Sequence, residues 1–368
     1  MVLPFMTLYM TESRGVSIGK AGFVMTMFGL GAICGAFIGG KLTDKFGFYY
    51  VQLFSLFGGG VMFLVLSQVQ DYNMILLTTF MLSFVNEAFR PANASAIAHF
   101  SKESNRTRSF SLNRLAINLG WAVGGTVGGF VASKSYYLLF WIDGLTNISA
   151  AVLLWLLLAP SKNKESAKKP EVYTGPVKTA YQDKPYLIFI VLTTLFAICF
   201  FQTFTTIPLY FKKELLMREN QIGIVMALNG LMIGILEMVI VHRLERKGGL
   251  LSNIMWGTLL VALSFMALNV LPGMFSLSLI FIVMLTIGEM IGMPFMNTYW
   301  IDRANNSNRG QYAALFTMSW AVAQVIGPGL GALIAQYGGF DMLWWVISGL
   351  CLVAIAGYRW LQVRTGSR

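Results

Sequence analysis

The chain has 368 residues, of which 56% are hydrophobic and only 12% are charged. An average soluble domain carries about 25% charged residues, so this composition and a mean hydropathy of +0.65 exclude an ordinary cytosolic enzyme, and they also exclude disorder. A polytopic membrane protein remains, and at about 20 residues per span the length has room for twelve helices. Three cysteines without paired spacing and two histidines predict neither a disulfide framework nor a metal site.

Eleven apolar runs are long enough to cross a bilayer as helices, and their continuous pattern differs from the alternation of a transmembrane β-barrel. They are residues 20–42, 50–68, 73–97, 110–132, 137–159, 186–211, 221–242, 250–271, 275–300, 311–335 and 341–360. Residues 1–10 form another apolar piece, which is too short to span alone. We therefore expect an all-α membrane protein with 12 transmembrane helices, of which the first is incomplete.

The basic residues predict the orientation of the chain. If residues 41–45 are cytoplasmic, 21 of the 27 Lys and Arg residues lie on or near that side and six lie on the other. The positive-inside rule then places the C-terminus and the central linker in the cytoplasm. This bias accounts for most of the formal net charge of +11, so nucleic-acid binding is not needed to explain it.

The second half of the chain repeats the first. At an offset of 201, and later 203, glycines, prolines and loop charges align without gaps. The matches include Gly22 with Gly223, Gly29 with Gly230, Pro91 with Pro294 and Trp141 with Trp344. Chance rarely keeps register through a whole half, so we predict a duplicated six-helix unit, as is common in transporters. The predicted parts are a bundle at 1–160, a cytoplasmic linker at 161–185 and a second bundle at 186–368.

The repeat also aligns Met1 with Gln202, although the seventh predicted helix begins near Tyr186. The first helix therefore lacks a counterpart of the stretch before Gln202. A misassigned start or a truncation is the favoured explanation, because half a helix would leave unsealed lipid-facing surface in the bundle.

Residues 40–47, with the sequence GKLTDKFG, lie between the second and third predicted helices. This string resembles the loop signature G-x-L-x-D-R/K-x-G of the major facilitator superfamily, although Phe48 and Tyr49 replace the usual basic pair that follows. Glycines permit a tight turn, and the Asp can make or break a contact between conformations. The resemblance implies two six-helix bundles. It also implies a gating role for Gly40, Asp44, Lys45 and Gly47.

A glycine-rich string in the fifth helix resembles the antiporter signature G-x-x-x-G-P-x-x-G-G of the same superfamily, and its echo in the eleventh helix keeps the proline. Small residues at this spacing let helices approach closely, so simple packing and a specific antiport role are both open interpretations. The residues of the two strings are Gly120, Gly124, Gly125, Gly128, Gly327, Pro328 and Gly331.

Further strings, at 90–91 and 288–294, resemble those of the bacterial 12-helix drug–proton antiporters in this superfamily. The string at 117–120 is also similar to one in proton-coupled peptide transporters. The resemblance therefore implies proton coupling but leaves efflux and uptake open.

Six ionisable residues fall inside the predicted spans, where each costs several kcal/mol and asks for a reason. Glu289, midway along its span, is predicted to bind a proton or a cationic substrate, and its repeat partner is Asn86. A protonated carboxyl bonded across helices is the structural alternative. Glu87 and Arg90 are neighbours on one helix face and predict an ion pair, which could open if Arg90 changes partner during gating. Arg114 could hold the Glu87 carboxylate or a substrate anion.

Two other carboxylates in the spans have less defined roles. Glu237, near the cytoplasmic end of the eighth helix, could snorkel to the interface or relay protons. Asp143 is predicted to cap a helix start or to lie at the surface. The Phe residues between 200 and 204 and the 21 Met residues would suit an adaptable apolar pocket, although any membrane protein needs such side chains.

These features predict a secondary active transporter, not an enzyme, that exports hydrophobic or cationic small molecules by alternating access. No G-x-x-x-x-G-K-S/T string occurs, so the expected energy source is a proton gradient rather than ATP or a cofactor. The alternatives are proton-coupled uptake of a peptide, sugar or organic anion, and a non-transporting membrane sensor. We expect a monomer in a bacterial inner or plasma membrane, with a small-molecule substrate and the bilayer as partners.

Overall fold

The computed structural model describes residues 2–101, 106–158, 179–245, 249–271, 273–304 and 309–365, and these residues form helices and no strand. The N-terminal half contains short turns at Leu3–Phe5, α1 (Met6–Leu8) and Tyr9–Ser13, then α2 (Ile18–Phe46), α3 (Phe48–Gln68), α4 (Tyr72–Glu87), α5 (Phe89–Phe100), α6 (Arg106–Ala132) and α7 (Tyr136–Leu157). The C-terminal half contains a turn at Ala180–Gln182, then α8 (Lys184–Lys213), α9 (Glu219–Glu245), α10 (Leu250–Val270), α11 (Phe275–Arg303) and α12 (Arg309–Thr365). The predicted linker lies outside the described residues up to position 178.

Nine of the described helices are long and apolar enough to cross a membrane, which confirms the expected all-α membrane fold. The predicted span at 73–97 is divided at Ala88 into α4 and α5. The last two predicted spans form the single element α12, in which Gly339 has a φ of 78°. Only glycine adopts this backbone conformation readily, so Gly339 marks the turn between the two spans.

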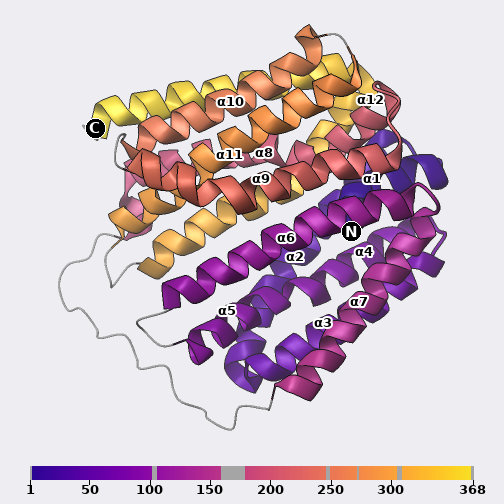
Figure 1. Ribbon diagram of the computed structural model, residues 1–368. Coiled ribbons are helices and arrows are strands. Elements are labelled where there is room, and N and C mark those ends of the chain that lie inside the picture. The colour runs from indigo at the N-terminus through magenta and orange to yellow at the C-terminus, as the bar shows by residue number, and fades with distance from the viewer. Residues whose placement is uncertain are drawn as a thin grey trace.

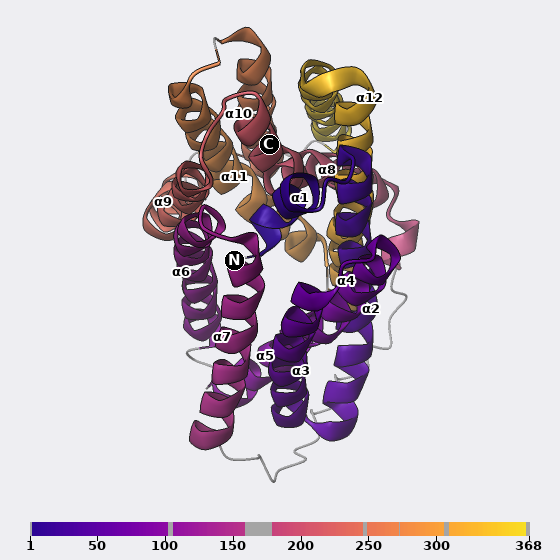
Figure 2. The same ribbon diagram turned by 90° about the vertical axis from the view of Figure 1, so that its right-hand side faces the viewer.

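The helices are arranged as two bundles, with the C-terminal half above the N-terminal half in Figure 1 and Figure 2. Within the bundles, α2 packs on α4, α3 on α7, α8 on α12 and α10 on α11. Two helix pairs join the halves: α6 packs against α9, and α2 packs against α12. We call these two contacts the seams.

Glycines that match in the repeat line both seams. A Cβ on Gly22 of α2 would collide with Ala332 of α12, and a Cβ on Gly223 of α9 would collide with the carbonyl oxygen of Gly125 in α6. Gly230, one full repeat after Gly29, would place a Cβ 2.8 Å from the carbonyl oxygen of Asn118. The duplicated glycines therefore permit close approach of helices from different halves.

Hydrogen bonds between the halves gather toward one end of the bundle, which we call the outer end; it carries the α6–α7 and α8–α9 connections. The Gly19 N–H donates to Gln336 Oε1 at 2.7 Å, and the Tyr136 hydroxyl donates to Glu219 Oε1 at 2.9 Å. Lys212 Nζ lies 2.7 Å from the same Glu219 oxygen. In this arrangement the halves are joined at the outer end, opposite the turn at Gly47.

Candidate functional site

Glu289 lies in α11 beside α9 and shares a polar contact with it. Nδ2 of Asn229 donates to Glu289 Oε2 at 3.1 Å and to Thr286 Oγ1 at 2.9 Å. The Thr286 hydroxyl donates its own proton to the Ile282 carbonyl at 2.6 Å, so its oxygen is available to accept from Asn229. A half-buried carboxyl is thus held by an amide from another helix, at a depth where a charge needs a partner.

Close packing of α11 on α10 sets the position of this carboxyl. A Cβ on Gly288 would lie 2.7 Å from the Gly257 carbonyl oxygen, so the backbones of α10 and α11 are nearly in contact beside Glu289. Sequence reasoning selected Glu289 but missed Asn229 and Thr286. An amide inside an otherwise apolar run was the available signal, since polar side chains in membrane helices commonly bond across helices.

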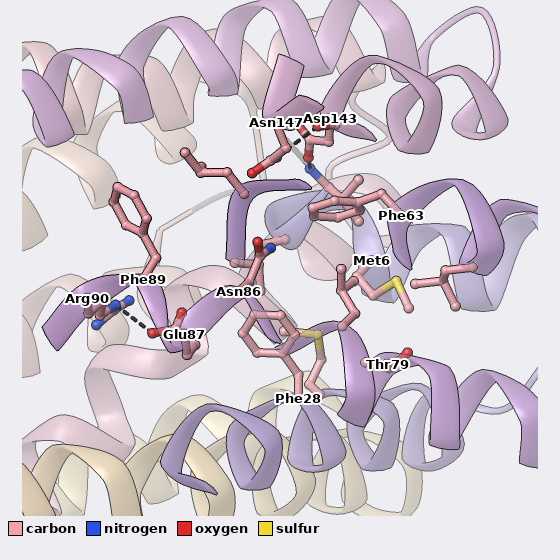
Figure 3. A pocket seen from close by; sticks show the side chains of 16 residues that line it. Met6, Phe28, Phe63, Thr79, Asn86, Glu87, Phe89, Arg90, Asp143 and Asn147 are labelled. Atoms are coloured by element: carbon pink, nitrogen blue, oxygen red, sulfur yellow. Dashed lines mark hydrogen bonds and ion pairs between the residues drawn. The ribbon is translucent and has the colours of Figure 1, made fainter. Parts of the chain in front are cut away.

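The N-terminal half holds different residues at the repeat-related positions. Asn86 and Phe28 correspond to Glu289 and Asn229, and both line a cavity of about 330 Å³ between α2, α3, α4, α7 and the N-terminal turns. Figure 3 shows Phe28 and Asn86 among the side chains that line this cavity. The Asn86 amide occupies the space that a Cβ on Gly59 would need.

Glu87 and Arg90 form the ion pair that their spacing predicts, with Arg90 Nε 2.6 Å from Glu87 Oε2 (Figure 3). The Glu87 side chain is 14% exposed and that of Arg90 is 75% exposed. The pair lies at the break between α4 and α5, and both residues line the cavity. The charge of the Glu87 carboxylate is therefore balanced by Arg90, three residues further along the chain, while most of the Arg90 side chain is exposed.

Asp143 is neither a helix cap nor a surface residue, so that prediction is wrong. Ser135 occupies the N-cap position of α7, whereas Asp143 lies two turns further in and is 8% exposed. Its Oδ2 accepts the backbone N–H of Val2 at 2.8 Å. Tertiary packing of the first turn against α7 buries a carboxylate that the sequence placed near a helix start.

Two predicted residues are described only in part, and a third, Glu237, is buried. The side chains of Asp44 and Arg114 lie outside the described residues, although their backbones belong to α2 and α6. Leu115, next to Arg114, lies 3.7 Å from the Cβ position of Gly234 in α9. Glu237 follows in α9 less than one turn later and is 7% exposed, so it is buried rather than snorkelling to the interface.

The loop string at 40–47 ends α2. Gly47 has a φ of 85°, and its N–H donates to the Thr43 carbonyl at 2.9 Å, so a glycine is required at this turn. Gly40 faces open space, since no atom lies within 4 Å of its Cβ position. Lys45 is exposed, with its ammonium 5.1 Å from the ring centre of Phe46.

The glycines of the antiporter-like string in α6 serve two surfaces. A Cβ on Gly125 would lie 3.3 Å from the Ala227 nitrogen of α9, and Gly128 is buried. Gly120 and Gly124, together with one side of Gly125, line a second pocket, of about 260 Å³, beside Trp121. The surface against α9 is part of a seam, and the surface beside Trp121 borders the pocket.

The echo in α12 packs within its own half. A Cβ on Gly331 would collide with the Gln202 amide of α8, and the Cβ position of Gly327 is 3.2 Å from the Ile198 carbonyl oxygen. Nε2 of Gln202 donates to the Gly327 carbonyl at 2.8 Å. Pro328 offers its own carbonyl oxygen to the α2 seam, 2.9 Å from the Cβ position of Gly22.

Known proteins share this sequence pattern and this fold. The model of the Major Facilitator Superfamily matches residues 1–251 and 206–368. The chain is 25% identical to the MFS-type transporter YqjV of Bacillus subtilis, over 99% of this chain and 91% of that protein. It is 22% identical to the Na(+), Li(+), K(+)/H(+) antiporter of Planococcus maritimus, over 98% and 91%, and to the class H tetracycline resistance protein of Pasteurella multocida, over 89% and 83%.

Solved structures agree on the fold. A peptide transporter, POT, in complex with sulfate superposes with a TM-score of 0.79 at 17% identity, covering 98% of this chain and 91% of that one. The nucleoside transporter NupG superposes with a TM-score of 0.77 at 14% identity, covering 98% and 94%. With the family model spanning both halves of a duplicated twelve-span plan, the chain belongs to the major facilitator superfamily and is a multi-pass membrane transporter.

Proposed function

We propose that the protein exports hydrophobic or cationic small molecules in exchange for protons, by alternating access of a site between its two halves. The observation that carries this proposal is the Asn229–Glu289 contact inside the membrane. A carboxyl at this depth gains a proton readily, because the membrane disfavours its charged form, and loses it when a donor or a cation approaches. Proton and cationic substrate can therefore compete for one group, which is the requirement of antiport.

The apolar surroundings support a lipophilic substrate. The ring centres of Trp121 in α6 and Phe204 in α8 are 5.2 Å apart, so aromatic rings from the two halves are in contact. Aromatic rings bind apolar and cationic groups alike. The printed names of two relatives, a cation/proton antiporter and a tetracycline resistance protein, point in the same direction.

The test is transport in proteoliposomes with an imposed pH gradient, with tetracycline and ethidium as probes. We expect Glu289→Gln to abolish gradient-driven transport, because the amide cannot take up and release the proton. Glu214→Gln, at an exposed position just after α8, is the matched control and should transport normally. Undiminished proton-driven transport by Glu289→Gln would remove Glu289 from the mechanism.

Uptake of a peptide, sugar or organic anion together with protons is the second candidate. It is favoured by the Arg90 guanidinium, which is largely exposed beside the cavity and could attract an anion. The direction of the driving gradient separates the two: efflux needs protons moving against the substrate, whereas uptake needs them moving with it. A non-transporting sensor would give no substrate-dependent proton flux in either direction.

A further inference from the structure

We propose that Asn229 is a positioning residue that holds the Glu289 carboxylate in its ionised form and links proton release to the seam between α6 and α9. This inference rests on the proposed function, in which Glu289 carries the proton. It assigns to Asn229 the control of when that proton leaves.

The hydrogen bonds of Asn229 favour one protonation state of its neighbour. An amide N–H can only donate, and donation stabilises a carboxylate more than a neutral carboxyl. Because the Thr286 hydroxyl donates its own proton to the Ile282 carbonyl, its oxygen accepts one of the two Asn229 N–H groups and leaves the other for Glu289. The amide therefore presents an N–H to Glu289 at 3.1 Å.

Among the described residues, the helices packed on α11 carry few other charged groups along the stretches that face it. The helices α8, α9, α10 and α12 pack on α11. No ionisable side chain occurs in α10. Residues 185–211 of α8 and 310–340 of α12 include no acidic, basic or histidine side chain. On α9, the nearest acidic residue in the direction away from the outer end is Glu237, two turns after Asn229. The neighbouring helix α6 carries Arg114, whose side chain lies outside the described residues. The thiol and phenol groups on these helices are Cys199, Cys351, Tyr186, Tyr210, Tyr299, Tyr312, Tyr337 and Tyr358.

The next residue after Asn229 belongs to the seam. A Cβ on Gly230 would lie 2.8 Å from the Asn118 carbonyl oxygen and 3.0 Å from the Ala122 nitrogen of α6. Backbones this close cannot slide past one another without moving the segment that carries Asn229. Rocking of the two halves therefore moves the Asn229 amide directly. In the arrangement described here, with the outer ends joined, this amide donates to Glu289.

The position is not needed by the scaffold itself. Its repeat partner in α2 is Phe28, an apolar residue that lines the same cavity as Asn86. A helix of the same unit thus packs at this place with an apolar side chain. The amide at 229 accordingly serves Glu289 rather than the packing of the bundle.

The experiment is the pH profile of tetracycline–proton exchange in proteoliposomes for Asn229→Leu and Thr286→Val. Asn229→Leu removes the donor at similar volume, so we expect the pH of half-maximal exchange to rise by about one unit. Thr286→Val leaves the Asn229–Glu289 bond intact and removes a competing acceptor, so its profile should stay or move toward acid. Equal shifts in both variants would indicate mere disturbance of packing and would overturn the proposal.

Two further variants keep the outcomes separate. Asn229→Ala, which adds no bulk, should reproduce the alkaline shift if Asn229→Leu fails to fold. If Glu289→Gln abolishes coupling while the profiles of both Asn229 variants match that of the unmodified protein, the role of Asn229 is refuted and the proposed function stands. If Glu289→Gln retains coupling, the proposed function itself fails.

Discussion

The two halves of this transporter share one scaffold but place different chemistry at equivalent positions. In the C-terminal half, Asn229 and Thr286 surround a carboxyl at position 289, whereas the N-terminal half has Phe28, Ser83 and Asn86 at the corresponding places. The seam glycines of α2 and α9, in contrast, match: Gly22 and Gly29 correspond to Gly223 and Gly230. Duplication has therefore kept these close helix contacts while the polar residues at the compared positions have changed.

The interiors of the halves differ as well. In the C-terminal half, the start of α8 packs tightly on α12: the Cys199 thiol contacts the Ile347 carbonyl, and the Thr193 hydroxyl contacts that of Tyr358. The N-terminal half holds the 330 Å³ cavity next to the corresponding part of α7, where Asp143 and Asn147 lie. The described contacts pack α8 closely on α12, whereas the corresponding place in the N-terminal half borders a largely apolar cavity, so substitutions of equal size should act differently in the two.

The largest effects are expected where the halves are alike. Gly22→Ala and Gly223→Ala each force a methyl group into a backbone contact at a seam, so each should destabilise the joined outer end by about 1–3 kcal/mol. The readouts are thermal unfolding and labelling of a cysteine introduced at Ser133 by a membrane-impermeant reagent. Gly349→Ala, which meets no atom within 4 Å, is the control and should be neutral or slightly stabilising. An effect at only one of the two seams would show that they are not equivalent.

A smaller effect is expected at the end of the C-terminal half that lies opposite the outer end, where residues of α11 and α12 meet Asp183 at the start of α8. Asp183 caps α8 and accepts hydrogen bonds from Arg303 of α11, at 2.9 and 3.0 Å, and from Tyr312 of α12. The repeat partner of Arg303 is Phe100. Asp183→Asn should therefore lower the free energy of unfolding by about 1–2 kcal/mol.

The same contact makes the free energy of unfolding depend on pH. Burial acts to raise the pKa of Asp183, but the hydrogen bonds from Arg303 and Tyr312 outweigh it and hold the pKa below its ordinary value. The stabilisation is thus complete above the ordinary pKa and is lost as the pH falls through the lowered one. Thermal unfolding of Asp183→Asn should lack this acid loss. Asp71→Asn, at the N-cap of α4 where Asn caps equally well, should keep it.

A change of several-fold in apparent substrate affinity is expected from Asn86→Ala. The amide lines the cavity, and one lost hydrogen bond corresponds to about 1 kcal/mol. The pH of half-maximal transport should stay unchanged, because the proton is assigned to the other half. Initial rates against substrate concentration at several pH values measure both quantities. A shifted pH profile would place proton chemistry in the N-terminal half as well.

The smallest effect is expected from Arg90→Ala. The guanidinium is 75% exposed, so solvent screens its attraction to Glu87 and the cost in unfolding free energy should stay below about 1 kcal/mol. Thermal unfolding at low and high salt measures it, and the difference from the unmodified protein should shrink as salt rises. Arg90→Lys, which keeps the charge, serves as the control. A large, salt-independent loss would contradict a screened pair.

Much of the fold could be predicted because its signals are local. Each span appears as a continuous apolar run, and the repeat survives as matched glycines, so helix number and duplication follow from the order of residues. The break at Ala88 was missed although Pro91 offered a signal, because proline lacks the N–H that would bond to the Glu87 carbonyl and so favours a break in the helix. Asp143 was misplaced for a related reason: its burial depends on Val2, which is distant in sequence and contacts it only after folding.

The candidate site divides in the same way. Glu289 and the Glu87–Arg90 pair were predicted because a charge in a membrane helix is costly and therefore conspicuous. Asn229 carries no charge and its partner is 60 residues away, so only the packing of α9 on α11 reveals its role. The sequence by itself thus determined the membrane class, the spans, the repeat and the costly carboxyl. Tertiary structure alone decided which neighbour holds that carboxyl and which glycines join the halves, because both depend on contacts between distant helices.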